Sequence, residues 1–407
     1  MDTAAAAPAD DASIQFLLRL GRAMHAYGYS AEQLERALMA MAARLGLEGQ
    51  FFTTPTSILA AIGPLPRQRT FLIRTEPGTI DLGKLDELDA LQNGVLERRL
   101  TPAEGLARVE ALIVRPGLYG PAARIAAAAL ASASSSVFLG GSARDAAFSG
   151  IVGGIVGAAG VAIDPGVASA RLYESAMACL AWLLAAAMAK YLGPISQANV
   201  ALSGIVALLP GLQLTLAMSE LATGHLASGS ARLIGAITVF VSLAIGVALG
   251  SRLSVLAFGA TPNIAPRHLG EWAVFAMVPL AAIGFTIVFR ARAREFVPIV
   301  IAGGLALGGA AIGARWLGSD LGSFIGAFTA AAVSNLFART RRRPAALTLV
   351  PAIVLLVPGS IGFSSLSSLL NRQVVPGVES AFRTIMIAVA LATGLLIADV
   401  VVPPRQT

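Results

Sequence analysis

Residues 197–218 read QANVALSGIVALLPGLQLTLAM, an apolar run long enough for a membrane-crossing helix but interrupted near its centre by Pro210-Gly211. Proline removes one backbone hydrogen bond and clashes with the preceding turn, and glycine accepts the irregular geometry that results. A shift of about 148 residues places Leu356-Val357-Pro358-Gly359 on Leu208-Leu209-Pro210-Gly211. Two interrupted helices at equivalent places indicate an internal repeat.

The composition of the chain is that of an integral membrane protein. Its 407 residues are 56% hydrophobic and only 13% charged, whereas an average soluble domain has about 25% charged residues. This balance excludes disorder and most soluble folds, and the single cysteine, Cys179, excludes a disulfide scaffold. Ten apolar segments follow residue 121, each long enough to cross a hydrocarbon core of about 30 Å. They cover approximately residues 122–140, 146–163, 172–192, 197–218, 231–250, 271–289, 296–314, 320–338, 345–369 and 381–402.

Residues 12–118 are more polar and predict a small soluble α/β module. Apolar residues at three- and four-residue spacing predict helices over 14–20 and 31–45, and the following pattern predicts strands over 51–62 and 69–74. Two further helices are expected over 82–100 and 103–114. The expected domains are a disordered N-terminus (1–11), the module (12–118), a first five-helix repeat (119–254), a linker (255–269), a second five-helix repeat (270–402) and a tail (403–407).

The charges of the chain predict its orientation in the membrane. Residues 1–120 carry 12 basic and 14 acidic residues, while residues 121–407 carry 18 basic and 9 acidic residues, with arginines at the segment ends. We interpret this excess as a topology signal and expect no nucleic-acid partner. The start of the chain has no signal-peptide pattern, so the module is expected in the cytoplasm. The inner loops then carry nine basic residues against six outside, mainly in the Arg290–Arg294 and Arg339–Arg343 clusters, which predicts that both termini are cytoplasmic.

The expected fold is therefore mainly α: ten transmembrane helices arranged as a 5+5 inverted repeat and preceded by the α/β module. Five crossings per repeat is an odd number, so the second copy lies upside down in the bilayer. Inverted repeats are typical of secondary transporters, whose substrate sites lie near the midplane between the halves. The helix start after each break exposes N–H groups and the positive end of the helix dipole, which suit a carboxylate.

The candidate site residues lie near the two breaks. Polar groups inside a membrane are costly and usually face the protein interior, and a carboxylate there is able to couple transport to protons. No motif for ATP binding, hydrolysis or metal binding is present, so neither a cofactor nor a metal is expected and the chain is not expected to be an enzyme. The expected substrate-binding residues are Asn199, Pro210, Gly211, Gln213, Asn335, Pro358, Gly359 and Ser360, and the expected proton-coupling residues are Glu220, Asp145 and Asp399.

The chain resembles the threonine/serine exporter family in its fused, two-half form. The resemblance covers residues 12–402 and rests on short motifs. These are Tyr27-Gly28-Tyr29-Ser30, Glu35, Leu45-Gly46-Leu47, Pro55-Thr56, Leu209-Pro210-Gly211 and Val357-Pro358-Gly359. It implies a multi-pass protein of the bacterial inner membrane that exports small amino acids, driven by the proton motive force. Some relatives are split into two chains and resemble dicarboxylate (succinate) exporters.

Other functions stay open beside amino-acid export. A dicarboxylate exporter is the first alternative, and a channel or scaffold controlled by the module is the second. An intramembrane enzyme is disfavoured because the candidate aspartates lie near segment ends. The expected partners are a small amino-acid substrate, protons and the lipid bilayer, and a homo-oligomer is possible.

Overall fold

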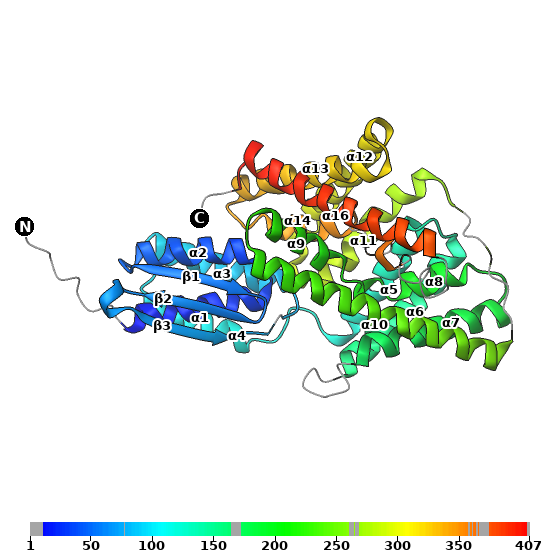
Figure 1. Ribbon diagram of the computed structural model, residues 1–407, viewed down its shortest axis with the longest axis horizontal. Coiled ribbons are helices and arrows are strands. Elements are labelled where there is room, and N and C mark those ends of the chain that lie inside the picture. Colours follow the sequence, from blue (N-terminus) through cyan, green and yellow to red (C-terminus); the bar gives the residue numbers. More distant parts are fainter. Residues whose placement is uncertain are drawn as a thin grey trace, which may run out of the picture.

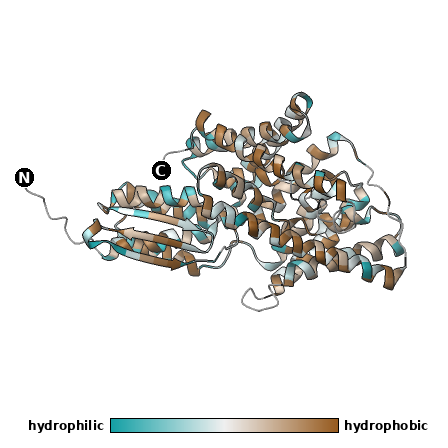
Figure 2. Ribbon diagram, in the orientation of Figure 1, coloured by the Kyte–Doolittle hydropathy of each residue, from teal (hydrophilic) through white to brown (hydrophobic). Residues whose placement is uncertain are grey.

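The computed structural model describes residues 11–76, 78–163, 172–259, 264, 268–356, 359, 361–363, 365 and 374–404. A small α/β module forms one end of the molecule, and a bundle of helices forms the other (Figure 1). Hydrophobic residues dominate the bundle helices, whereas hydrophilic residues are frequent in the module (Figure 2). The mainly helical class is therefore confirmed.

The module packs helices against a three-stranded antiparallel sheet of strand order β1-β2-β3. The expected helices are present, and Ser30 and Thr101 begin two of them with capping boxes. A single strand over 51–62 was the wrong prediction, because Pro55 and Thr56 form a turn that separates two paired strands. The elements are α1 (Asp11–Tyr27), α2 (Ala31–Arg44), β1 (Gly49–Thr54), β2 (Ser57–Ile62), η1 (Leu65–Arg67), β3 (Arg69–Arg74), α3 (Leu82–Leu96) and α4 (Pro102–Val114).

The bundle contains several helices of membrane-crossing length. Among the described residues, six helices are long and apolar enough to cross a membrane, or seven if one bent pair is counted as a single span. The prediction of ten spans is confirmed only in part. The bundle elements are α5 (Pro121–Phe138), α6 (Ala143–Ala162), α7 (Tyr173–Tyr191), α8 (Gln197–Gly204), η3 (Val206–Leu208), α9 (Gly211–Ala222), α10 (Leu226–Phe258), α11 (Glu271–Val288), η4 (Ala293–Glu295), α12 (Phe296–Leu317), α13 (Ser319–Arg341), α14 (Ala346–Val354) and α16 (Val374–Val401).

Two of the expected spans are long enough to cross a membrane but carry polar and charged residues that lower their hydropathy. Helix α5 has 18 residues and carries Arg124 and a run of serines, and α7 has 19 residues with Glu174 and Lys190 near its ends. A third expected span, 345–369, begins with α14, which ends at Val354. These polar or interrupted segments explain why hydropathy and length together identify fewer spans than the sequence pattern predicted.

The connections of the bundle lie at two opposite ends. The turn before α10, the loop between α11 and α12, the loop between α13 and α14 and the C-terminal end of α16 all lie on the side of the module (Figure 1). At the other end, Arg144 donates to the carbonyl of Leu192, and Arg315 lies 3.9 Å from Glu271. Among the described connections, those before α10, α12 and α14 thus lie on the module side, and those before α6, α8 and α13 lie at the other end.

Candidate functional site

The broken fourth segment is a bent helix with an irregular centre. The helices Gln197–Gly204 and Val206–Ala222 meet at an angle of 51°. Pro210 is the N-cap of α9, and the Leu214 N–H donates to its carbonyl at 3.0 Å. The N–H groups of the first α9 turn therefore have no partner within their own helix. Both Pro210 and Gly211 are buried, so this polar backbone lies inside the protein.

The two breaks touch each other. A Cβ atom built on Gly359 lies 3.2 Å from the Leu209 Cβ and 3.6 Å from the Gly211 Cα, so only the smallest residue fits there without displacement. Residues after each break pack into the opposite half. Leu212 joins an apolar cluster of the second half, and Phe363 joins one of the first half. Residues at both breaks thus contribute to the contacts between the two expected repeats.

The polar residues expected to bind substrate do not gather at this centre. Asn199 accepts a hydrogen bond from the Ser136 hydroxyl at 2.5 Å and donates to the Leu139 carbonyl at 3.2 Å, which caps the end of α5. Asn335 holds the end of α16 instead, through the Asp399 carboxylate at 2.8 Å. The Gln213 side chain is exposed. Pro358 and Ser360 lie outside the described residues.

The Glu220 carboxylate lies where the module meets the bundle, and only 2% of this residue is exposed. Its Oε1 atom accepts the Ala31 N–H, at the start of α2, at 3.0 Å. The Arg232 guanidinium donates from Nε to both carboxylate oxygens at 3.0 Å, and the Ser228 hydroxyl donates to Oε2 at 2.8 Å. Beside it, the His225 ring lies 3.4 Å from the Glu35 carboxylate of the module. The carboxylate is thus fully hydrogen-bonded.

The other two candidate carboxylates lie at opposite ends of the bundle. Asp145 caps α6 by accepting from Ser142, and its second oxygen accepts the Ser196 N–H at 2.8 Å, which ties the start of α6 to the start of α8. Asp399 lies at the end nearer the module and accepts from Asn335. Both groups hold helix ends in place.

A second contact joins the module to the bundle through opposite charges. The Asp86 carboxylate of α3 lies 3.1 Å from Arg294 and 3.0 Å from Arg343, and Glu87 accepts from Arg292 at 2.6 Å. Glu87 is partly buried, which raises its pKa, but the hydrogen bonds from Arg115 and Arg292 outweigh burial and lower the pKa below its usual value. The arginine clusters of the bundle therefore serve as the docking surface for an acidic helix.

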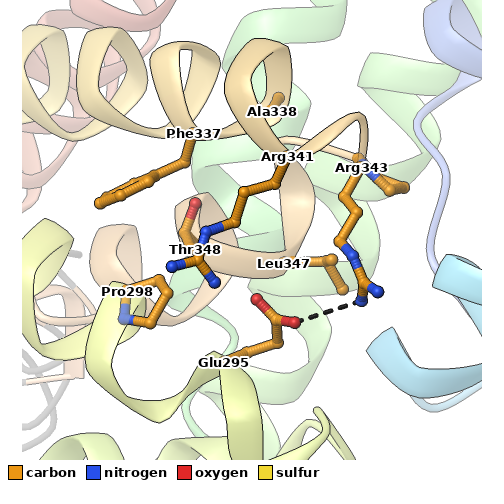
Figure 3. Close-up of a pocket in the computed structure, with 9 residues that line it drawn as sticks. Glu295, Pro298, Phe337, Ala338, Arg341, Arg343, Leu347 and Thr348 are labelled. Carbon is orange, nitrogen blue, oxygen red and sulfur yellow. Dashed lines mark hydrogen bonds and ion pairs between the residues drawn. The ribbon is translucent and has the colours of Figure 1, made fainter.

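A small pocket lies beside this contact, between α12, α13 and α14 (Figure 3). Its accessible volume is about 10 Å³, enough for roughly one water molecule. Glu295 and Arg341 point into it, and Arg343 reaches Glu295 at 3.3 Å (Figure 3). A pocket of this size is too small to hold an amino acid.

Sequence reasoning did not identify the acidic partners of the arginine clusters. Asp81, Asp86 and Glu87 look like ordinary surface charges of an amphipathic helix, yet each pairs with an arginine more than two hundred residues away. The available signal was the charge balance: residues 1–120 carry two more acidic than basic residues, whereas residues 121–407 carry nine more basic than acidic residues.

Comparison with known proteins identifies the family. The threonine/serine exporter model matches residues 15–254, and a second model, "Threonine/Serine exporter, ThrE", matches residues 273–401. No solved structure matches the chain. Among curated proteins, Pheromone-regulated membrane protein 10 of Saccharomyces cerevisiae is 24% identical over 90% of this chain, and that of Debaryomyces hansenii is 26% identical over 90%.

The chain covers 48% of the Saccharomyces protein and 37% of the Debaryomyces protein, so it spans about half or less of these relatives. A Schizosaccharomyces pombe protein, "Uncharacterized protein C7D4.12c", is 24% identical over 96% of this chain, which covers 55% of it. The two family models together span the module and both halves of the bundle. This chain therefore belongs to the threonine/serine exporter family.

Proposed function

We propose that the chain exports small amino acids of the threonine/serine type from the cytoplasm by alternating access between two inverted five-helix repeats. The observation that carries this proposal is the contact between the two breaks, at Gly359 and Leu209-Gly211. Irregular backbone at membrane depth is tolerated where it is buried in protein or lines a wet cavity. In transporters built from inverted repeats, such breaks form the substrate site.

The alternation of the connections supports ten crossings with the module and the C-terminus on one side. The loops before α10, α12 and α14 all contact the module, whereas the contacts of Arg144 with Leu192 and of Arg315 with Glu271 lie at the far end. Five crossings per half then give the two halves opposite orientations. The arginine clusters lie on the module side, which under the positive-inside rule supports a cytoplasmic location for this side. In a bacterial cell this membrane is the inner membrane.

The break geometry suits a zwitterion. The N–H groups at the start of α9 offer hydrogen bonds and a positive dipole end to a substrate carboxylate. In this proposal, the second half contributes the equivalent backbone groups to the substrate site from Pro358-Gly359-Ser360. Carbonyls released by each break are acceptors for the ammonium group. Asn199 and Asn335, which hold helix ends in this structure, are assigned supporting roles rather than direct contact.

Glu220 is the carboxylate that we assign to proton coupling. It is buried and pairs with Arg232 on the same half of the bundle. Protonation would release the guanidinium and weaken the acceptor that holds the Ala31 N–H, so a proton there changes the contact between bundle and module. Asp145 and Asp399 bridge helix ends, and we assign them a smaller part in coupling.

The test is counterflow in proteoliposomes preloaded with threonine, with and without an inward proton gradient. Saturable exchange of labelled threonine, stimulated by the gradient, is the expected result. Exchange of succinate but not of threonine or serine would move the protein to the dicarboxylate alternative. Unsaturable flux would favour a channel.

Two variants test whether the first break and Glu220 take part in transport. Gly211→Leu places a side chain at the first break, and Glu220→Gln removes the charge while keeping the shape of the side chain. We expect both to lower exchange while the protein still inserts and purifies as the wild type does. Exchange at the wild-type rate in both variants would remove the site assignment while leaving the transport function in place.

A further inference from the structure

The module is joined to the second half of the bundle by an extensive contact. Leu82 and Leu85 of α3 belong to one apolar cluster with Ile299 and Leu347. The N–H groups of Leu82 and Gly83 donate to the carbonyls of Phe289 and Arg290 at 2.9 and 3.1 Å, so the start of α3 caps the end of α11. Together with the pairs between α3 carboxylates and arginines, these contacts fix the module to the second half.

The side-chain contact between the module and the first half is polar. The Ala31 N–H donates to Glu220 and Glu35 pairs with His225, beside the place where strand β1 packs against α10. Within the part of the chain that the structure describes, no cluster of buried apolar residues includes both module and first-half residues. The two contacts of the module therefore differ in kind, one apolar and charged and the other polar.

Each polar group of the smaller contact keeps other partners on its own side. Glu220 retains Arg232 and Ser228, which both lie on α10. Glu35 retains the Thr53 N–H at 2.7 Å and the Thr53 hydroxyl at 2.9 Å, within the module. Breaking this contact thus leaves no buried charge unpaired, which is the main cost of separating an ion pair. Separating the other contact would instead expose apolar surface to water.

We propose that the module is a cytoplasmic latch. It moves with the second half of the bundle, and its contact through Ala31 and Glu35 holds the turn between α9 and α10 in the first half. This inference rests on the alternating-access function proposed above. For the breaks to become open to the cytoplasm, the ends of the two halves on the module side must separate. The module bridges these ends, so the latch opens at Glu220 and His225 before substrate enters.

Covalent closure of the latch tests this proposal. In a Cys179→Ala background, Glu35→Cys and His225→Cys are joined with a bifunctional maleimide of matching span, and Asp86→Cys with Arg343→Cys forms the control pair. Both pairs are measured for threonine counterflow before and after cross-linking. We expect cross-linking of the latch pair to abolish exchange in proportion to the cross-linked fraction, and cross-linking of the control pair to leave exchange unchanged. Unchanged exchange in the fully cross-linked latch pair would overturn the proposal.

A second measurement judges the latch without transport. Hydrogen exchange of the backbone amides of residues 205–214 reports the opening of the first break to water. We expect the cross-linked latch pair to exchange more slowly there than the cross-linked control pair. Equal exchange in the two cross-linked proteins would overturn the latch. If the wild type transports neither threonine, serine nor succinate, the proposed function is overturned but the latch is not. The comparison of amide hydrogen exchange between the two cross-linked proteins still decides the latch.

Discussion

Replacing Gly359 by alanine measures how much the contact between the two breaks matters. The added Cβ would lie 3.2 Å from the Leu209 Cβ and 3.7 Å from the Gly211 N atom, whereas carbon atoms attract best at about 3.5–4.0 Å. The neighbours must therefore move by a few tenths of an ångström. Overpacking costs about 1–3 kcal/mol, and the better helix propensity of alanine returns about 0.5–1 kcal/mol. We expect a net loss of stability of up to about 2.5 kcal/mol.

The matched control is Gly304→Ala in α12, because no heavy atom lies within 4 Å of the Cβ position at Gly304. This change brings the helix propensity of alanine without crowding, so it should stabilise the protein by up to about 1 kcal/mol. Thermal unfolding in detergent compares the two variants. Threonine efflux from proteoliposomes, at equal protein content, then separates an effect on transport from an effect on stability.

We expect Gly359→Ala to slow efflux and Gly359→Val to slow it further, because the larger side chain covers the start of α9. Gly304→Ala should export at the wild-type rate. The reasoning fails if Gly359→Val folds and exports as fast as the wild type. In that case the contact between the breaks contributes only to packing, and the substrate site must lie elsewhere.

Two further changes test the module. Gly83→Ala places a Cβ 2.7 Å from the Arg290 carbonyl oxygen. It should therefore weaken the contact between the module and α11 by about 1–3 kcal/mol and speed proteolytic release of the module. Gly120→Ala is the control and should change neither, because no heavy atom lies within 4 Å of its Cβ position. Burial lowers the pKa of His25, which contacts the Thr54 carbonyl at 2.9 Å. The unfolded state therefore binds more protons, and stability falls as the pH drops below 6.5. His25→Gln should reduce this loss in melting curves recorded across the same pH range; an unchanged pH dependence would exclude His25 as its source.

The broad fold could be predicted because it depends on local patterns. Apolar length identified the bundle, and apolar spacing identified the module helices, two of which Ser30 and Thr101 cap in the structure. The strand prediction failed at Pro55 and Thr56, which form a tight turn between Thr54 and Ser57, and these two flanking residues pair with each other. The predicted number of spans is confirmed only in part. Serines and charged residues in α5 and α7 lower the hydropathy of these helices without preventing them from forming.

The candidate site could be predicted only at the level of the backbone. Proline and glycine change helix geometry wherever they occur, so Pro210-Gly211 identified the break from the sequence alone. The side chains were different, because an asparagine inside a bundle has many possible partners. Asn199 and Asn335 are satisfied by the ends of neighbouring helices. Which partner an amide finds depends on tertiary contacts, and one sequence carries no direct signal of them.

The arginine clusters show how one set of charges serves two purposes. The positive-inside rule considers only the membrane side on which Arg290–Arg294 and Arg343 lie. The structure places Asp86 against three of these arginines, at 3.0 to 3.8 Å. An arginine paired with a carboxylate has less charge to offer to lipid phosphates, so the module acts as the counterion of this face. The partners lie more than two hundred residues apart, and the sequence records their match only in the opposite net charges of residues 1–120 and 121–407.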